Sequence, residues 1–170
     1  MFPLGTAQDV LVVEESEVEE APAHLDAVHA AALPLTGLTG WRALVSKSGN
    51  ASAGRNILVT GVGGGVALNI LQFAVAFGAN VFVTSGDMGK ISRAIELGAK
   101  GGVSYKSETW EKELLEQLPT DRPFLDSIID GAGGDVVKRT VRLLKVRFPN
   151  TFFGAWLIAY RLEAQLCSMA

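Results

Sequence analysis

A glycine-rich loop at residues 61–67 carries the clearest chemical signal in this sequence. It follows a β-branched apolar stretch and precedes a long apolar segment. At such a junction glycines let the backbone approach a diphosphate, whose charge is stabilised by the N-terminus of the following helix. A strict G-x-G-x-x-G count from Gly61 ends on Val66, so the loop fits a variant motif that ends on Ala67. The candidate cofactor-binding residues here are Gly61, Gly63, Gly64, Gly65 and Val66.

The loop predicts a dinucleotide site, with a ligand-free glycine turn as the alternative. No Gly-Lys-Ser or Gly-Lys-Thr follows the glycines, which excludes a Walker-type ATP site. About 20 residues further on, a dehydrogenase that uses NAD places an acidic residue for the ribose 2′-hydroxyl. Here the small Ser85 leaves room for a 2′-phosphate and Lys90 can neutralise it, so we predict NADP(H) over NAD(H). Asp87 lies close by and keeps NAD(H) open.

A second glycine loop, residues 130–134, follows another short apolar run. Ligands of doubly wound sheets bind beyond the carboxyl ends of the strands, so this loop is expected beside the first. Gly131 would then lie near the nicotinamide ribose, although a plain strand-to-helix turn explains it equally well. The sequence offers no convincing proton donor, and we name no catalytic residue.

The elements that must position these loops alternate between strand and helix. Such alternation with short connections predicts an α/β fold, a Rossmann-type parallel sheet with helices on both faces. Ser107 is expected to cap the third of the helices. The expected strands are residues 56–60, 80–84, 102–105 and 125–129, and the expected helices are residues 67–77, 88–97, 107–118 and 133–144.

The flanks of this core are less regular. Residues 21–47 predict two short helices broken at Pro34, and residues 8–13 fit one strand. After Lys145 the rhythm calls for a fifth strand, yet residues 146–150 predict a turn, and residues 151–166 suit a helix as well as a strand. We therefore expect a sheet that is incomplete at one edge.

Composition limits the class of protein. The 170 residues are 48% hydrophobic and 19% charged, which suits one domain and excludes a disordered chain. The one cysteine, Cys167, excludes a disulfide framework and a cysteine-rich zinc site. No apolar run reaches the ~20 residues of a membrane span, and residues 1–5 lack the start of a signal peptide. We expect a cytoplasmic protein without a membrane partner.

Charge is unevenly distributed along the chain. Lys and Arg are absent before Arg42 and gather after Val136. A solvated helix face explains the basic part better than nucleic-acid binding, because no aromatic residues interleave with its charges up to Arg147.

Several segments together resemble the medium-chain dehydrogenase/reductase superfamily. The resemblance is to its quinone-oxidoreductase-like branch, which includes zinc-type alcohol dehydrogenase-like proteins. It implies that Ser85, Lys90 and Tyr105 grip the 2′-phosphate and that Thr39 lies near the nicotinamide end. The segments that carry it are residues 33–44, 61–67, 79–81, 97–99 and 126–134.

The departures from that family predict a truncated chain. Residues 1–47 match only the last stretch of a GroES-like catalytic domain, residues 48–145 match the NADP-binding domain, and residues 146–170 form an atypical tail. Zinc-dependent members take their ligands from the missing part, and the two histidines and Cys167 show no ligand spacing, so no zinc is expected.

The predicted function is hydride transfer from NADP(H) to a small carbonyl or a quinone or enone. The alternative is a nucleotide-binding fragment without turnover. A third hypothesis is an interaction module that forms a homo-oligomer through an exposed sheet edge.

Overall fold

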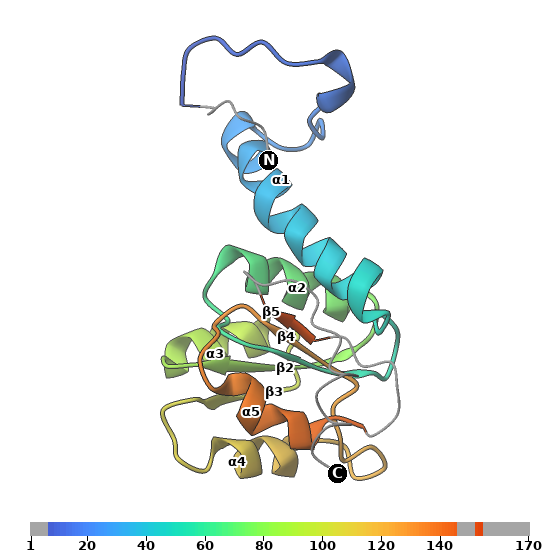
Figure 1. The fold of residues 1–170 in the computed structure, drawn as a ribbon, viewed down its shortest axis with the longest axis vertical. Coiled ribbons are helices and arrows are strands. Elements are labelled where there is room, and N and C mark those ends of the chain that lie inside the picture. The colour runs from blue at the N-terminus through green and yellow to red at the C-terminus, as the bar shows by residue number, and fades with distance from the viewer. Residues whose placement is uncertain (1–6, 146–151, 155–170) are drawn as a thin grey trace, which may run out of the picture. The chain divides into compact units, whose positions relative to one another are not determined.

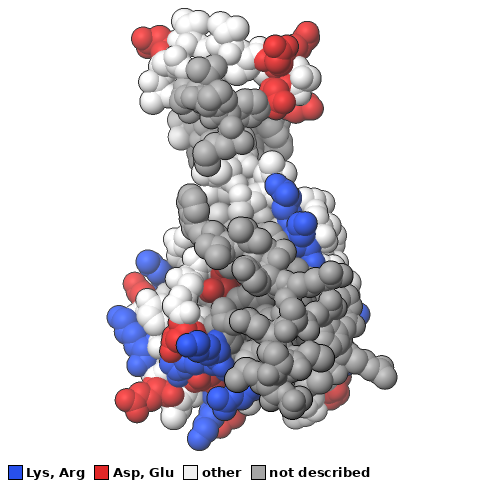
Figure 2. All heavy atoms as spheres, in the orientation of Figure 1, with Lys and Arg blue, Asp and Glu red and all other residues white. Residues whose placement is uncertain are grey.

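The computed structural model describes residues 7–145 and 152–154, and its contacts divide the chain into two compact units, Met1–Leu33 and Pro34–Ala170. The first unit contains the short 3₁₀ helix η1 (Glu15–Glu17) and carries acidic side chains but no Lys or Arg (Figure 2). The strand predicted at residues 8–13 is wrong, because the segment pairs with no described strand. The side chains of Val10 and Val12 are largely exposed there, so no apolar surface drives them into a sheet.

The second unit is built on a five-stranded sheet in the order β3-β2-β1-β4-β5 (Figure 1). Every neighbouring pair is parallel, which confirms the predicted α/β, Rossmann-type fold. The strands are β1 (Asn56–Val59), β2 (Asn80–Ser85), β3 (Gly101–Ser104), β4 (Ser127–Asp130) and β5 (Phe152–Gly154).

Helices cover both faces of this sheet because its strands alternate apolar residues between them. Ile57 and Val59 join the core under one set of helices, and Leu58 between them joins the core under the other. The first set is η2 (Arg42–Ser48), a π-helical segment, with α2 (Gly65–Ala76) and α3 (Met88–Glu96). The second set is α4 (Trp110–Gln117), α5 (Val136–Thr140) and the 3₁₀ helix η3 (Val141–Leu143).

The register brings the predicted loops to one edge of the sheet. Val59 of β1 lies opposite Val83 of β2 on one side and Ile129 of β4 on the other. Since the three strands are parallel, the segments that follow them leave the sheet side by side. The loops at residues 61–65 and 130–134 therefore meet at the carboxyl ends of the strands.

The break predicted at Pro34 is wrong, because helix α1 (Ala27–Trp41) runs through it. Proline keeps a helical φ and removes one hydrogen bond, a loss that neighbouring good helix formers can tolerate. Packing also holds the later part of the helix: Gly40 is buried so closely against α2 that an added Cβ would lie 3.2 Å from Ile70 Cγ1.

Two predicted helix starts are also wrong. Ser107 does not cap α4 directly: its Oγ accepts a hydrogen bond from Thr109 N–H at 3.2 Å, and the helix begins at Trp110. The helix predicted from residue 133 begins only at Val136, because Gly133 and Gly134 have φ of 73° and 75°, outside the helical region.

A fifth strand is present where the sequence predicted an incomplete edge. β5 pairs with β4, with Ile128 opposite Phe152 and Asp130 opposite Gly154. Its pattern is too short to predict from periodicity, so its place is decided by the strand beside it. The turn predicted at residues 146–150 lies outside the described residues, as does most of the segment at 151–166.

Candidate functional site

The first glycine loop is tied to the end of β2. Val62 N–H donates to the Thr84 carbonyl at 2.9 Å, and Gly61 N–H donates to Thr84 Oγ1 at 3.2 Å. Gly61 has φ 64°, so a residue with a side chain would be strained there. The hydrogen-bond ladder of α2 starts with Leu68 N–H donating to the Gly64 carbonyl at 3.0 Å. The N–H groups of residues 65–67 therefore lie in the first turn, where a helix offers them no carbonyl.

A cavity of about 260 Å³ opens beside this loop. Among its lining residues, the polar side chains are those of three threonines and one aspartate, and the others are apolar residues or glycines. Whole-ligand pockets are typically about 300–1,000 Å³, so this cavity suits one part of a dinucleotide. The lining residues are Thr36, Thr39, Ala43, Val59, Thr60, Gly61, Gly64, Gly65, Val66, Ala67, Ile70, Ile129, Asp130 and Gly131.

At two glycines in this lining, the packing of the protein leaves room for a side chain. A Cβ on Gly64 would come no closer than 3.9 Å to another group, and a Cβ on Gly131 would meet nothing within 4 Å. Gly64 has φ −86° and ψ 148°, which any residue adopts. Neither packing nor backbone strain explains glycine at Gly64. What a side chain there would fill is the space of the cavity, so the residues present fit a ligand whose phosphate approaches the backbone.

The end of β2 gathers the residues predicted for a 2′-phosphate. Lys90 of α3 extends over the first loop, where a Cβ on Gly63 would lie 3.2 Å from Lys90 Nζ. Tyr105 follows β3, and a Cβ on Gly86 would lie 2.5 Å from its hydroxyl. Ser85 is 5% exposed, and its Oγ accepts a hydrogen bond from Asp87 N–H at 3.2 Å. A hydroxyl that accepts one bond keeps its own proton to donate.

Asp87, the residue that kept NAD(H) open, is the N-cap of α3. Its Oδ1 accepts a hydrogen bond from Gly89 N–H at 2.8 Å. Capping of this kind satisfies one of the unpaired donors of the first turn. One oxygen of this carboxylate is therefore engaged by its own helix.

The second glycine loop is held by a buried carboxylate. Asp130 is 2% exposed, and its Oδ1 accepts a hydrogen bond from Thr60 Oγ1 at 2.5 Å and one from Ala132 N–H at 3.1 Å. Gly133 N–H donates to Oδ2 at 3.1 Å. Thr60 Oγ1 in turn accepts from Gly131 N–H at 3.1 Å.

The two loops lie close together, since a Cβ added to Gly61 would lie 3.5 Å from Ala132 Cβ. Neither Thr60 nor Asp130 is among the candidate site residues predicted from the sequence. The available signal was a polar residue directly before each glycine loop, at the ends of two strands.

Threonines from α1 complete the cavity. Thr39 lines it as predicted, with its Oγ1 donating to the Leu35 carbonyl at 2.6 Å. Thr36, which the sequence analysis did not select, accepts a hydrogen bond from Asn69 Nδ2 at 3.1 Å. Its Cγ2 would lie 3.0 Å from a Cβ on Gly65, so glycine is needed there for α1 and α2 to approach.

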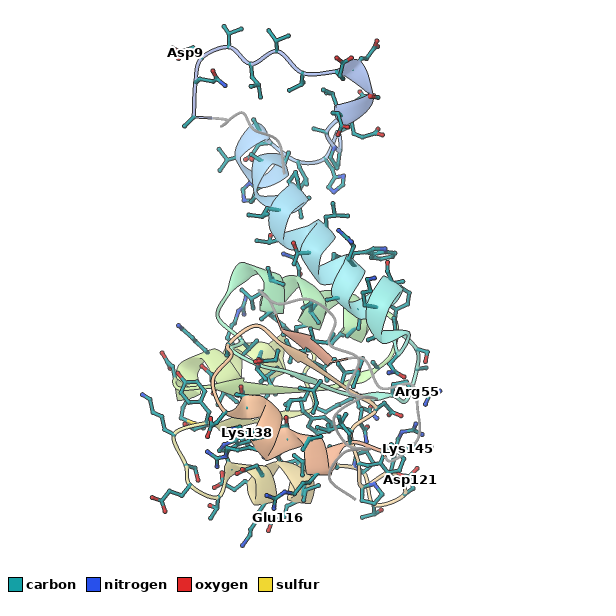
Figure 3. All side chains as sticks on the ribbon, viewed as in Figure 1. Asp9, Arg55, Glu116, Asp121, Lys138 and Lys145 are labelled. Atoms are coloured by element: carbon teal, nitrogen blue, oxygen red, sulfur yellow. The ribbon has the colours of Figure 1, made fainter. Side chains whose placement is uncertain are left out.

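A second charged cluster lies at the opposite ends of the strands. Asp126 is buried, and Arg122 donates to both of its oxygens, at 2.8 and 2.5 Å, while Arg55 donates to one at 3.1 Å. Burial raises the pKa of Asp126, but the hydrogen bonds from Arg122, the Asn56 N–H and Arg55 outweigh it and hold the pKa below its usual range. Arg55 precedes β1 (Figure 3), so this cluster fastens the sheet at the end away from the glycine loops.

Within residues 7–145 and 152–154, no three His, Cys, Asp or Glu side chains come together as metal ligands would. His29 instead contacts Asp26 Oδ1 through Nδ1 at 2.7 Å, and Cys167 lies outside that range. In the same part of the chain, no helix is long and apolar enough to cross a bilayer.

Comparison with known proteins agrees with this geometry. The family model described as zinc-binding dehydrogenase matches residues 65–156, more than half of the chain. A zinc-type alcohol dehydrogenase-like protein, YogA, from Leptosphaeria maculans is 55% identical over 85% of this chain and 41% of its own length. Human NAD(P)H oxidoreductase RTN4IP1, named as mitochondrial, is 36% identical over 76% of this chain and 32% of its own. The chain thus spans less than half the length of these curated relatives.

Solved structures give the same assignment. An NAD-dependent alcohol dehydrogenase aligns with a TM-score of 0.74 and 28% identity, over 85% of this chain and 48% of that one. A quinone oxidoreductase from Pseudomonas syringae aligns with a TM-score of 0.69 and 29% identity, over 80% of this chain and 41% of that one. The chain belongs to the zinc-binding dehydrogenase family and carries its alcohol dehydrogenase- and quinone oxidoreductase-like NAD(P)-binding domain.

Proposed function

We propose that this chain is the NADP(H)-binding part of an oxidoreductase that transfers hydride to a small carbonyl, quinone or enone. The observation that carries the proposal is the approach of Lys90 Nζ to Gly63, next to a strand end that holds Ser85. A cation and a small hydroxyl at this position suit a 2′-phosphate, whereas NAD(H) calls for a carboxylate. Asp87, the nearest carboxylate along the chain, caps α3.

The roles of the other residues follow from their places around the cavity. Gly61, Gly63, Gly64, Gly65 and Val66 would hold the diphosphate at the start of α2. Ser85, Lys90 and Tyr105 would hold the 2′-phosphate on the β2 side. Gly131 and Thr39 would lie on the nicotinamide side. When bound, the cofactor supplies the hydride chemistry, and these residues bind and orient it.

One observation favours binding without turnover by these residues alone. Of the side chains that line the described cavity, only Asp130 is ionisable. Its oxygens already accept from Thr60 Oγ1, Ala132 N–H and Gly133 N–H, so it is not placed to give a proton to a substrate. A proton donor for a carbonyl would then come from elsewhere, and this chain would bind NADPH without oxidising it.

Calorimetric titration of the chain with NADPH and with NADH tests the cofactor choice. We expect NADPH to bind more tightly than NADH. Lys90→Ala should weaken NADPH binding by about 10- to 150-fold, because a hydrogen bond to a charged group is worth about 1.5–3 kcal/mol. It should leave NADH binding almost unchanged.

Arg93→Ala is the matched control, because Arg93 is an exposed cation on the same helix that pairs with Glu96. It should change the affinity for neither nucleotide. If Lys90→Ala weakens NADPH and NADH equally, Lys90 does not recognise the 2′-phosphate and the cofactor assignment is wrong. Following NADPH absorbance with a panel of quinones and enones then separates an active oxidoreductase from a binding module.

A further inference from the structure

We propose that Thr60 and Asp130 form a positioning pair that fixes the nicotinamide half of the dinucleotide site, without contacting the adenosine half. The inference rests on the proposed function, because it assumes that the cavity holds part of a dinucleotide. Thr60 and Asp130 are two of the residues that line that cavity. They act through the second glycine loop, so they are positioning residues and not catalytic ones.

The two side chains bond to each other and to the backbone of the second glycine loop. Asp130 Oδ1 accepts from Thr60 Oγ1 at 2.5 Å and from Ala132 N–H at 3.1 Å, while Thr60 Oγ1 accepts from Gly131 N–H at 3.1 Å. The two side chains are 1% and 2% exposed. Together they bind consecutive N–H groups of a glycine-rich segment that has little conformational preference of its own. Without the pair, those N–H groups would lose their partners and the loop its single conformation.

The same hydrogen bonds also engage the carboxylate oxygens of Asp130 within the protein. A carboxylate beside a diphosphate would repel it if its lone pairs faced the ligand. Here both oxygens are engaged by donors of the protein, with Gly133 N–H donating to Oδ2 at 3.1 Å. The buried carboxylate of Asp130 can therefore lie beside the diphosphate site, because its oxygens are engaged by the protein and the second glycine loop exposes its backbone to the ligand.

The strand order separates this pair from the adenosine side. Because β1 lies between β2 and β4, the end of β2 with Ser85 and the end of β4 with Asp130 lie on opposite sides of the first glycine loop. A ligand that stops at the first loop from the β2 side would not reach Gly131. Removing the Thr60–Asp130 pair should therefore weaken binding of the whole dinucleotide and leave binding of its adenosine half unchanged.

The test measures two ligands on the 170-residue chain: NADPH and adenosine 2′,5′-bisphosphate, which lacks the nicotinamide half. Thr60→Val removes the hydroxyl and keeps the shape of the side chain. We expect the Kd for NADPH to rise about tenfold, the equivalent of about 1.4 kcal/mol, and the Kd for the bisphosphate to stay within about twofold. Retained binding of the bisphosphate also shows that the variant is folded.

Two further variants make the test specific. Thr60→Ser keeps the hydroxyl and should bind NADPH with an affinity near that of the wild type. Thr140→Val removes another fully buried hydroxyl, one that donates to the Val136 carbonyl at 2.7 Å in α5 and does not line the cavity. It should change neither Kd.

The outcomes distinguish the inference from the proposed function. If the wild-type chain binds neither ligand, the proposed function fails and the inference fails with it. If the wild type binds both, and Thr60→Val weakens both equally or neither, the dinucleotide site stands and the positioning role of the pair is refuted. Failure of Thr60→Ser to bind NADPH with an affinity near that of the wild type would equally refute it.

Discussion

Replacing Gly64 by alanine should weaken nucleotide binding while leaving the fold intact. The added methyl would meet no protein atom closer than 3.9 Å, so the folded chain can accommodate it. Gly64 has φ −86° and ψ 148°, a conformation that alanine adopts without strain. The methyl would enter the cavity beside the first turn of α2, where the diphosphate is proposed to bind.

The expected magnitudes differ sharply between stability and binding. Alanine reduces the conformational entropy of the unfolded chain, which adds about 0.4–1 kcal/mol to the free energy of unfolding. As an N-cap residue alanine is less favourable than glycine, which subtracts a similar amount. The free energy of unfolding should therefore stay within about 1 kcal/mol of wild type. Forcing a methyl group into a filled site costs about 1–3 kcal/mol, which corresponds to NADPH binding weakened by about 5- to 150-fold.

Gly54→Ala is the matched control because it should lower stability without changing NADPH binding. Gly54 also has open space around its Cα, but its φ is 73° and it lies before β1, away from the cavity. Alanine in the left-handed region costs about 1–2 kcal/mol of stability, and NADPH affinity should not change.

Thermal unfolding and calorimetric titration of both variants give the four values needed. If Gly64→Ala binds NADPH as wild type does, the cavity does not hold the diphosphate and the reasoning is refuted.

Two further predictions concern stability. Asp126→Asn should lower the free energy of unfolding by about 1–3 kcal/mol at neutral pH, because Arg122 and Arg55 lose a buried acceptor. The pKa of Asp126 lies below its ordinary value of 3.8 in the folded chain, so its stabilisation is complete above that pH and is lost as the pH falls further. In urea titrations, wild type and variant should therefore converge below about pH 4, and a constant difference would contradict the assignment. Arg139→Lys should lower the thermal midpoint more than Arg93→Lys, because Arg139 donates twice to Glu111 and stacks 5.0 Å from the Trp110 ring; equal shifts would refute it.

Local patterns were sufficient to predict most of the sheet. Strands β1, β2 and β4 are short, mainly apolar runs followed by polar or glycine-rich turns, and such runs are buried wherever helices cover both faces. Once four parallel strands are predicted, the two glycine loops must emerge at their carboxyl ends. The place of the candidate site therefore follows from topology alone.

Other features depend on contacts between residues far apart in the chain. Pro34 remains helical in a helix whose later part packs Gly40 against α2, and Phe152–Gly154 forms a strand because β4 offers it an edge. Propensity describes each residue with its neighbours in sequence, so it cannot anticipate either outcome.

The amino-acid sequence by itself determined the alternation of strands and helices, and with it the glycine loops at one edge of a parallel sheet. Only the tertiary structure decided which polar groups meet there: Lys90 over Gly63, and Thr60 with Asp130. The physical reason is that backbone pattern and burial are local properties of the chain. A hydrogen bond between residues 70 positions apart exists only when the register of β1 and β4 brings them together.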